Sequence, residues 1–473
     1  MSYLWAAQVA EARRAGCAQR SALLRHRYLT ERPLGMVMWQ LGAEPFTAAA
    51  VAWGFGPEQR EIAVPGEPRD RELSFRALTG VARSFNAWFE GATGRDQPPQ
   101  IVIPNRGNLR LLDRLGRRLA YLPTDGETPA DPELVRFGIH LRFLAERVLY
   151  PGQQLVVALT ELLSTHWITE LSELEGQSLP ALDAAIDPPE HLTAHEAARS
   201  AEGVEIGPLP SREDDERVDP LVAAFNRRRG RRAEESVVAP LRSEIEQHYL
   251  QLVDRGWVLL WRCLARERAY HEAPGVARRW QEDVDALERH LDWVNEGGRY
   301  RTRHTHARAA RTMRRWEDAQ RLLEAEEAID DPLRMIPALL ANDAVQGRVV
   351  DVDLAHREQG PKRSVRRPLV TLACEERCLM PIGKQLWWTG TPAAKHYTVL
   401  TVVPAGAAWH VTLRHETSYA HPRPEVGEDV TFSIHHTSAS LPIMLPDNPP
   451  WTHRKQEVAM DAIEEGQDAR GWE

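Results

Sequence analysis

Arginine is the residue type in this chain whose spacing most clearly suits a chemical role. Between residues 299 and 316 the sequence holds seven arginines and no acidic residue. A helix is predicted from about residue 303 to residue 329, and if it begins by residue 301, one of its faces carries Arg301, Arg308, Arg311 and Arg315. Because the planar guanidinium donates two hydrogen bonds at once, such a stripe can follow the phosphates of a nucleic acid. The alternative is a solvated face whose arginines pair with acids elsewhere, for example in the acidic segment 161–219.

A second basic cluster falls between two predicted β-strands nearer the C-terminus. Its members are Lys362, Arg363, Arg366 and Arg367. In an OB-fold barrel this connection helps to clamp nucleic acid. A tryptophan on a neighbouring strand, Trp388, could stack on a base, which contributes about 1–3 kcal/mol. Because Trp387 and Trp388 face opposite sides of a strand, one must be covered by another domain, a partner or a ligand.

Two carboxylates, Glu72 and Asp183, are the candidates for metal-assisted catalysis. Glu72 stands in the run 69–78, which begins a predicted helix, and segment 101–105 is a predicted strand. With the order of predicted elements over 33–187, these runs resemble ribonuclease H-like domains. The resemblance implies that Glu72 and Asp183 would hold divalent cations, Mg²⁺ or Mn²⁺, which activate water for phosphodiester cleavage.

The chain departs from this family at positions that bind the metal. Gln40 stands near the place where the family has an aspartate on its first strand, and the fourth strand ends in Asn105. An amide binds a divalent cation weakly and brings no charge. The resemblance therefore implies a fold without a complete two-metal site, and an unrelated α/β domain remains the alternative interpretation.

His166 and Glu170 form a second candidate metal site. They are four residues apart on a predicted helix, and this spacing places two ligands on one helical face. The alternative is an ordinary hydrogen bond between two surface side chains. Outside the nuclease interpretation, we expect no metal and no cofactor. The sequence has no glycine-rich phosphate loop of the Gly-Lys-Ser/Thr type and no Gly-x-Ser-x-Gly motif.

The apolar pattern predicts a multidomain α+β protein. Five strand-like runs mixed with helical patterns predict an α/β domain over 1–187. Helical spacing predicts a bundle or hairpin over 236–332, and short strands separated by turns predict a small closed β-barrel over 345–446. The predicted barrel resembles an OB-fold. A solvated linker, first acidic and then arginine-rich, is expected at 188–235, and a loosely held tail at 447–473.

Length and composition limit the class of protein further. A chain of 473 residues is expected to form two to three domains, and a net charge of −9 argues against a protein that coats nucleic acid along its whole surface. No apolar run is long enough to span a bilayer, so no membrane partner is expected. Four scattered cysteines suit a reducing compartment, and we expect the protein to be cytoplasmic.

Three functions are compatible with these features. The leading hypothesis is a nucleic-acid-associated protein that binds or scaffolds without catalysis. The first alternative is a metal-dependent nuclease of the ribonuclease H-like type, with Glu72 and Asp183 among its ligands. The second alternative is a component of a protein assembly that binds no nucleic acid.

Overall fold

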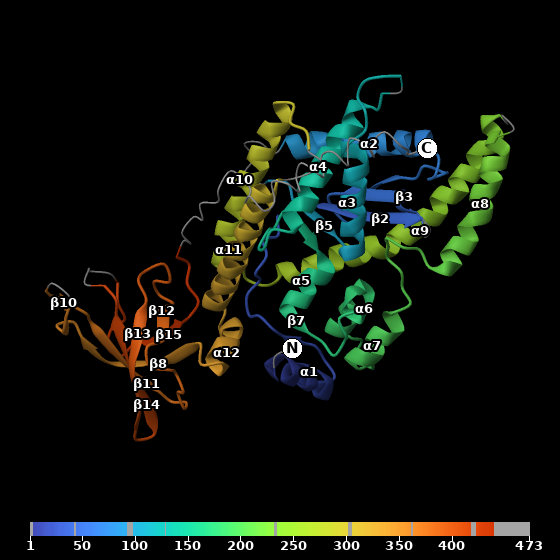
Figure 1. Ribbon diagram of the computed structural model, residues 1–473. Coiled ribbons are helices and arrows are strands. Elements are labelled where there is room, and N and C mark those ends of the chain that lie inside the picture. Colours follow the sequence, from blue (N-terminus) through green and yellow to red (C-terminus); the bar gives the residue numbers. More distant parts are fainter. Residues whose placement is uncertain are drawn as a thin grey trace, which may run out of the picture.

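The protein is a mixed α+β molecule in which a large helix-covered sheet is joined to a small β-barrel (Figure 1). The computed structural model describes residues 3–41, 44–91, 98–127, 129–230, 234–300, 305–360, 363–417 and 422–438. The α+β architecture predicted from the sequence is confirmed. In the part of the chain that the structure describes, no helix has both the length and the apolar character needed to cross a membrane.

The central sheet has five strands in the order β4-β3-β2-β5-β6. Their bounds are β2 (Leu34–Leu41), β3 (Glu44–Gly54), β4 (Glu61–Ala63), β5 (Ile101–Ile103) and β6 (Val156–Ala158). The first three strands form an antiparallel meander, whereas β5 and β6 run parallel to β2. The carboxyl ends of β2, β5 and β6 therefore meet at one edge of the sheet.

Helices cover both faces of this sheet. One face, with Met36 and Met38 of β2, packs on three helices that follow in the chain: α2 (Arg71–Glu90), α3 (Arg106–Ala120) and α4 (Pro132–Val148). The other face, with Val37 and Trp39, packs on α5 (Leu159–His166), α6 (Leu179–Ile186), α8 (Arg212–Gly230) and α9 (Glu235–Arg268). Successive residues of β2 enter opposite cores because side chains alternate along a strand. The strand is buried throughout, as expected for the centre of a covered sheet.

The helical region does not form the bundle of its own that its sequence suggested. Helix α9 joins the core on one face of the sheet, through Tyr249 and Trp257 among others. Helix α10 (Gly275–Asn295) joins the core on the opposite face, through Trp280, Leu287 and Leu291. The apolar stripes of these helices were predicted correctly, but the sheet, and not another helix, is the surface that they cover.

The segment predicted as a solvated linker contains helices. Helix α7 (Ala194–Ala201) begins with a capping box, and α8 buries Val218, Val222 and Phe225. Acidic residues occupy the first turn of α8 and arginines its last turn, an arrangement that the helix dipole favours. The charge pattern that suggested a linker is therefore the charge pattern of an amphipathic helix.

The C-terminal part forms a closed antiparallel barrel, as predicted. Its six strands follow the order β11-β14-β13-β12-β15-β8. They are β8 (Ala344–Asp353), β11 (Leu369–Cys374), β12 (Gln385–Trp388), β13 (Tyr397–Ala405), β14 (Ala408–His415) and β15 (Asp429–Ser433). An OB-fold has five strands, so this barrel is larger by one strand. A short hairpin of β9 (Arg357–Gln359) and β10 (Ser364–Arg366) lies between β8 and β11.

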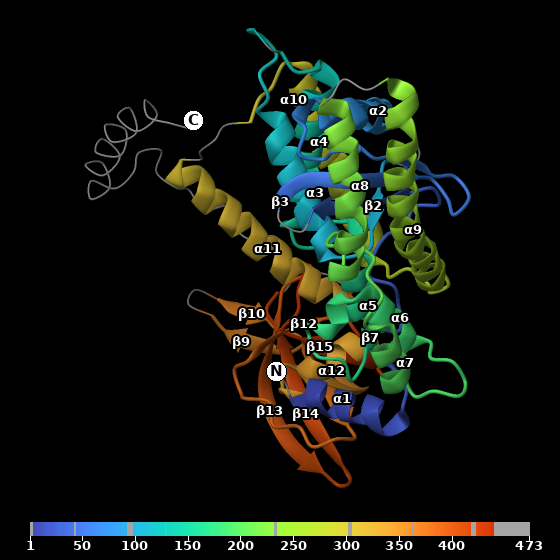
Figure 2. The same ribbon diagram turned by 90° about the vertical axis from the view of Figure 1, so that its right-hand side faces the viewer.

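Two helices join the sheet to the barrel. Helix α11 (His306–Asp330) begins at the N-cap Thr305, and α12 (Pro332–Leu340) leads into β8. Near its C-terminal end, α11 buries Ala325 and Ala328, whereas its N-terminal half projects from the body of the molecule (Figure 2). The remaining short elements are α1 (Tyr3–Ala15), β1 (Gln19–Arg20), β7 (Trp167–Ile168) and the 3₁₀ helix η1 (Glu175–Gln177).

Candidate functional site

The sheet edge where the ribonuclease H-like resemblance would put metal ligands holds two buried amides, Gln40 and Asn105. The Asn105 Oδ1 atom caps α3 by accepting a hydrogen bond from the backbone N–H of Asn108, 2.9 Å away. The Asn105 Nδ2 atom donates to the carbonyl oxygen of Gly207 at 2.8 Å. The backbone N–H of Gln40 donates to the carbonyl oxygen of Pro208 at 2.7 Å. The segment 206–208 therefore lies directly against this edge.

The close approach of this segment depends on glycine. Gly207 has a φ of +93°, and a Cβ atom at this position would lie 2.7 Å from the carbonyl oxygen of Met38. The preceding residue, Ile206, is buried in the core that contains Trp39. The backbone at the sheet edge is thus held by the fold, through the side-chain amide of Asn105 and the backbone N–H of Gln40.

The two catalytic candidates lie on elements at opposite ends of the body (Figure 1). Glu72, in the first turn of α2, is exposed and pairs with Arg76. Asp183, on α6, is buried and pairs with Arg262 and Arg266 of α9. Among the described residues, no group of three or more histidine, cysteine, aspartate or glutamate side chains is placed to hold a metal ion.

His166 and Glu170 do not share a helical face. Helix α5 ends at His166, because Trp167 and Ile168 form β7 and pair with β1. The His166 side chain is fully buried, and its Nδ1 atom lies 2.8 Å from a Glu267 carboxylate oxygen. Glu170 pairs instead with Arg13. The prediction of a shared face was wrong because strand pairing ends the helix before its next turn.

The predicted arginine stripe lies on the projecting half of α11. Arg308, Arg311 and Arg315 are all exposed there, and Arg301 lies outside the described residues. The sequence pattern also predicts that Met313, on a different face of this helix, turns toward a helical bundle, but Met313 is 60% exposed. The projecting half makes too few tertiary contacts to bury an apolar face, so that part of the prediction was wrong.

The second basic cluster lies in the hairpin between β8 and β11, as predicted. Arg363 and Arg366 are exposed, whereas Arg367 is half-buried and donates to the carbonyl oxygen of Glu416. Lys362 lies outside the described residues. The hairpin and the projecting half of α11 lie on the same side of the molecule (Figure 2). We call Arg308, Arg311, Arg315, Arg363 and Arg366 the basic surface.

The acidic segment 161–219 does not neutralise this surface. Its densest part, on α8, lies across the body from α11 (Figure 1) and pairs locally, as Glu213 does with Arg217. Within the described residues, Arg308 and Arg315 form no ion pair. The interpretation of the stripe as a partner of this acidic segment therefore has no support in the geometry.

The two adjacent tryptophans face opposite sides of β12, as predicted. Trp388 packs against the barrel core. Trp387 faces outward and stacks on His436, with 4.2 Å between the ring centroids. His436 is held in turn by Arg321 of α11, which donates to its carbonyl oxygen at 3.0 Å. Trp387, and not the candidate Trp388, is therefore the tryptophan at the seam between α11 and the barrel.

A cleft of about 1210 Å³ opens beside the carboxyl ends of β5 and β6. Its walls come from α1, α5, β7 and α12. The end nearest the sheet carries Arg27, Arg106, Glu161 and Arg334, together with the hydroxyl groups of Thr160, Ser164 and Thr165. The far end carries Glu170, Glu173 and Glu175. The cleft could not be predicted from the sequence, because its walls come from segments far apart in the chain; its one local signal is an arginine directly after a predicted strand.

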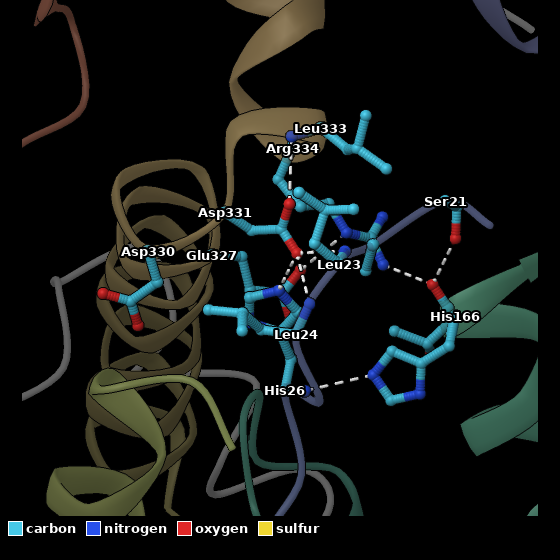
Figure 3. Close-up of polar contacts among 12 residues, drawn as sticks. Ser21, Leu23, Leu24, His26, His166, Glu327, Asp330, Asp331, Leu333 and Arg334 are labelled. Carbon is cyan, nitrogen blue, oxygen red and sulfur yellow. Dashed lines mark hydrogen bonds and ion pairs between the residues drawn. The ribbon is translucent and has the colours of Figure 1, made fainter. Parts of the chain in front are cut away.

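A buried aspartate holds the wall of the cleft together (Figure 3). The Asp331 Oδ2 atom accepts hydrogen bonds from the backbone N–H groups of Leu23 and Leu24, at 2.6 and 2.9 Å. It also lies 3.3 Å from Nε2 of His26, whose pKa is lowered by burial. The neighbouring Arg334 donates to the carbonyl oxygen of Thr165. These bonds join the N-terminal segment, the α11–α12 junction and α5.

No protein family, curated protein or solved structure is found to match this chain. Its function is therefore inferred from charge, exposure and cavity geometry.

Proposed function

We propose that the protein binds nucleic acid without cleaving it, through the basic surface on α11 and the β9–β10 hairpin. The observation that carries this proposal is the half of α11 that projects from the body (Figure 2), because its residues Arg308, Arg311 and Arg315 are all exposed. At a rise of about 1.5 Å per residue, these three arginines span roughly 10 Å of helix, enough to contact successive phosphates of one strand.

The net charge of the molecule does not oppose this mode of binding. The chain carries a net charge of −9, but residues 299–316 contain no acid, and the next acids on α11, Glu317 and Asp318, pair with Arg314. Contacts between arginine and phosphate release condensed counterions, so affinity should fall steeply with salt. A local surface of this kind suits a protein that grips one stretch of backbone and does not coat a whole strand.

The α/β part would then act as a scaffold, and its sheet edge supports this role. The order of strands and helices along residues 33–187 is the order on which the ribonuclease H-like resemblance relies. Gln40 and Asn105 replace carboxylates of that family, and segment 206–208 lies against both. Together these features favour a catalytically degenerate domain over a nuclease.

The barrel contributes its hairpin to the proposed interface. The hairpin connects the first two barrel strands, which is the connection that an OB-fold uses to clamp nucleic acid. With six strands the barrel is only OB-like, so the proposal depends on the exposed Arg363 and Arg366 and not on membership of that fold.

Paired charge reversals test this proposal. In fluorescence-anisotropy titrations with labelled single-stranded, duplex and hybrid oligonucleotides, Arg311→Glu with Arg315→Glu should weaken binding about tenfold or more at low salt. Arg363→Glu with Arg366→Glu should do the same. A matched control, Arg227→Glu with Arg228→Glu, changes the net charge equally at exposed positions on α8.

Each outcome of this titration has a clear meaning. Weakening by both α11 and hairpin variants, with the α8 control near the parent affinity, would support the basic surface. Equal weakening by all three would indicate only general charge attraction, and unchanged affinity in the first two would contradict the proposal. The oligonucleotides recovered after incubation with Mg²⁺ or Mn²⁺ should be intact. If they are cleaved, and the Glu72→Gln variant cleaves them as well, the catalytic site must lie elsewhere.

The protein-assembly alternative has one specific observation in its favour. Leu340, Leu379 and Ile382 are 64%, 57% and 73% exposed at the junction of α12 with the barrel. The backbone N–H of Leu379 donates to Asn342, which brings its loop to the end of α12. Analytical ultracentrifugation of the protein and of Leu379→Ser with Ile382→Ser would show whether this apolar group mediates self-association.

A further inference from the structure

The large cleft lies where open α/β sheets usually bind ligands. Such sheets bind in the crevice outside the carboxyl ends of their strands. Arg106 is the first residue of α3, three positions after β5 ends, and Thr160 is the second residue of α5, two positions after β6 ends. The cleft is thus placed as a binding site would be, and it is separate from the basic surface on α11 and the hairpin.

The end of the cleft nearest the sheet has an excess of positive charge. Three guanidinium groups, those of Arg27, Arg106 and Arg334, line it against one carboxylate, that of Glu161. Arg106 pairs with Glu161 in the first turn of α5, and Arg334 donates to Thr165 one turn later. Both arginines are therefore held beside the same helix, about 6 Å apart along its axis.

This end of the cleft also offers hydrogen-bond donors. The Arg334 Nε atom is buried and has no hydrogen-bond partner among the described residues, and it lies 3.9 Å from a carboxylate oxygen of Glu327. The Ser164 side chain is exposed and lines the same wall. Arginines beside hydroxyl groups form the usual donor set for a phosphate group, because its oxygens accept several charge-assisted hydrogen bonds.

The opposite end of the cleft has different chemistry. Glu170, Glu173 and Glu175 line it and supply hydrogen-bond acceptors. Trp5 and Trp167 also line the cleft. A ligand that fits must carry negative charge at one end and N–H donors on a flat group at the other. The volume of the cleft, about 1210 Å³, is above the roughly 300–1,000 Å³ of typical small-molecule sites, so the cleft is large enough to hold a nucleotide.

We propose that this cleft binds a nucleoside phosphate, with the phosphate among Arg27, Arg106 and Arg334 and the base toward the glutamates. The ligand is either a free nucleotide or the phosphorylated terminal nucleotide of a strand. A free nucleotide would add a small-molecule site to the protein. A strand end would fix the position of a nucleic acid that the basic surface holds elsewhere.

Isothermal titration calorimetry with AMP, ATP and inorganic phosphate tests the site on the full chain. AMP should bind more tightly than inorganic phosphate, and Arg106→Ala should weaken AMP binding about tenfold, since a charge-assisted bond contributes on the order of 1.5–3 kcal/mol. The control Arg117→Ala removes an exposed arginine that pairs with Asp113 on α3 outside the cleft, and it should leave AMP affinity unchanged. Arg106→Lys should restore part of the binding.

Further measurements make the result decisive. Arg106 is largely exposed, and thermal unfolding of Arg106→Ala should match that of the parent protein, so lost binding would not reflect lost folding. Competition between AMP and a terminally phosphorylated oligonucleotide, but not its hydroxyl-ended form, would identify a strand end as the source. Without competition, AMP binding would indicate a free nucleotide. Three results would overturn the proposal: no binding of AMP or ATP, AMP binding no tighter than that of inorganic phosphate, or unchanged AMP binding in Arg106→Ala. Each of them would do so independently of the oligonucleotide affinity of the basic surface.

Discussion

At the scale of single residues, buried polar groups decide how this chain is held together. Asp331 is fully buried, and its two oxygens accept from backbone N–H groups of Leu23, Leu24 and Leu333. Nothing in the sequence indicates its contacts with Leu23 and Leu24, whose backbone N–H groups lie 308 and 307 residues away in the chain. Sequence reasoning finds the patterns of side chains, but it cannot find a buried hydrogen-bond acceptor whose donors come from a distant segment.

Replacing Asp331 by asparagine should destabilise the protein. If the amide nitrogen of the introduced asparagine takes the place of Oδ2, the backbone N–H groups of Leu23 and Leu24 lose their acceptor and face another donor. The free energy of unfolding should therefore fall by about 3 kcal/mol. Urea unfolding followed by circular dichroism measures this change. The control Asp429→Asn breaks only an exposed pair with Arg348 and should change the midpoint little. Equal effects of the two substitutions would contradict the assigned role of Asp331.

A buried histidine pair gives the protein a predicted sensitivity to acid. The His140 Nδ1 atom lies 3.0 Å from Nε2 of His290, and its Nε2 atom lies 2.8 Å from Glu90. Burial, together with the neighbouring His140, lowers the pKa of His290 to about 2, and burial also lowers the pKa of His140. Both rings are therefore neutral in the folded protein near neutral pH.

Stability should fall as the pH drops below about 6.5, the ordinary pKa of histidine in an unfolded chain. Below that pH the two histidines bind protons in the unfolded state but stay neutral in the folded state. The free energy of unfolding should therefore fall by about 1.4 kcal/mol per pH unit for each of them. His290→Gln removes one titrating group, so its free energy of unfolding should fall less steeply between pH 6.5 and 5 than that of the parent. Parallel curves for the two proteins would rule out this role for His290.

At the scale of elements, charge patterns were easier to locate than to interpret. The arginine-rich helix was expected and is present, and it begins at His306, close to the predicted start near residue 303. The acidic and then basic run at 212–230 was interpreted as a linker but forms α8, because Val218, Val222 and Phe225 give it a buried face. Three apolar residues outweigh a long series of charges, since burial and not charge decides whether such a segment packs.

The projecting half of α11 should be a locally stabilised element. Ala309→Gly with Ala310→Gly should cost about 2 kcal/mol of local helix stability, with little change in the global unfolding midpoint, because both residues are exposed. If the helical conformation is needed to hold the arginines in place for binding, the double variant should also bind oligonucleotides more weakly. Hydrogen exchange of the 306–316 amides reports the local effect. The control Ala325→Gly, in the packed half, should lower the global midpoint instead.

At the scale of the whole molecule, the sequence predicted the parts better than their arrangement. The five strands of the sheet and the closed barrel could be predicted from residue periodicity, which is a local property. The cleft, the contact of segment 206–208 with the sheet edge and the position of α9 and α10 on opposite faces could not. Each depends on segments that are distant in the chain, and no local pattern encodes which of several apolar faces will meet.

The salt dependence of oligonucleotide binding tests the central claim most directly. Anisotropy titrations at several salt concentrations give the slope of log affinity against log salt, which counts the phosphates that the protein neutralises. We expect the slope to become shallower by about 2 when Arg311 and Arg315 are both replaced by alanine, and to stay unchanged when Arg227 and Arg228 are replaced. A parent slope near zero, or an α11 variant with the parent slope, would contradict binding through this surface.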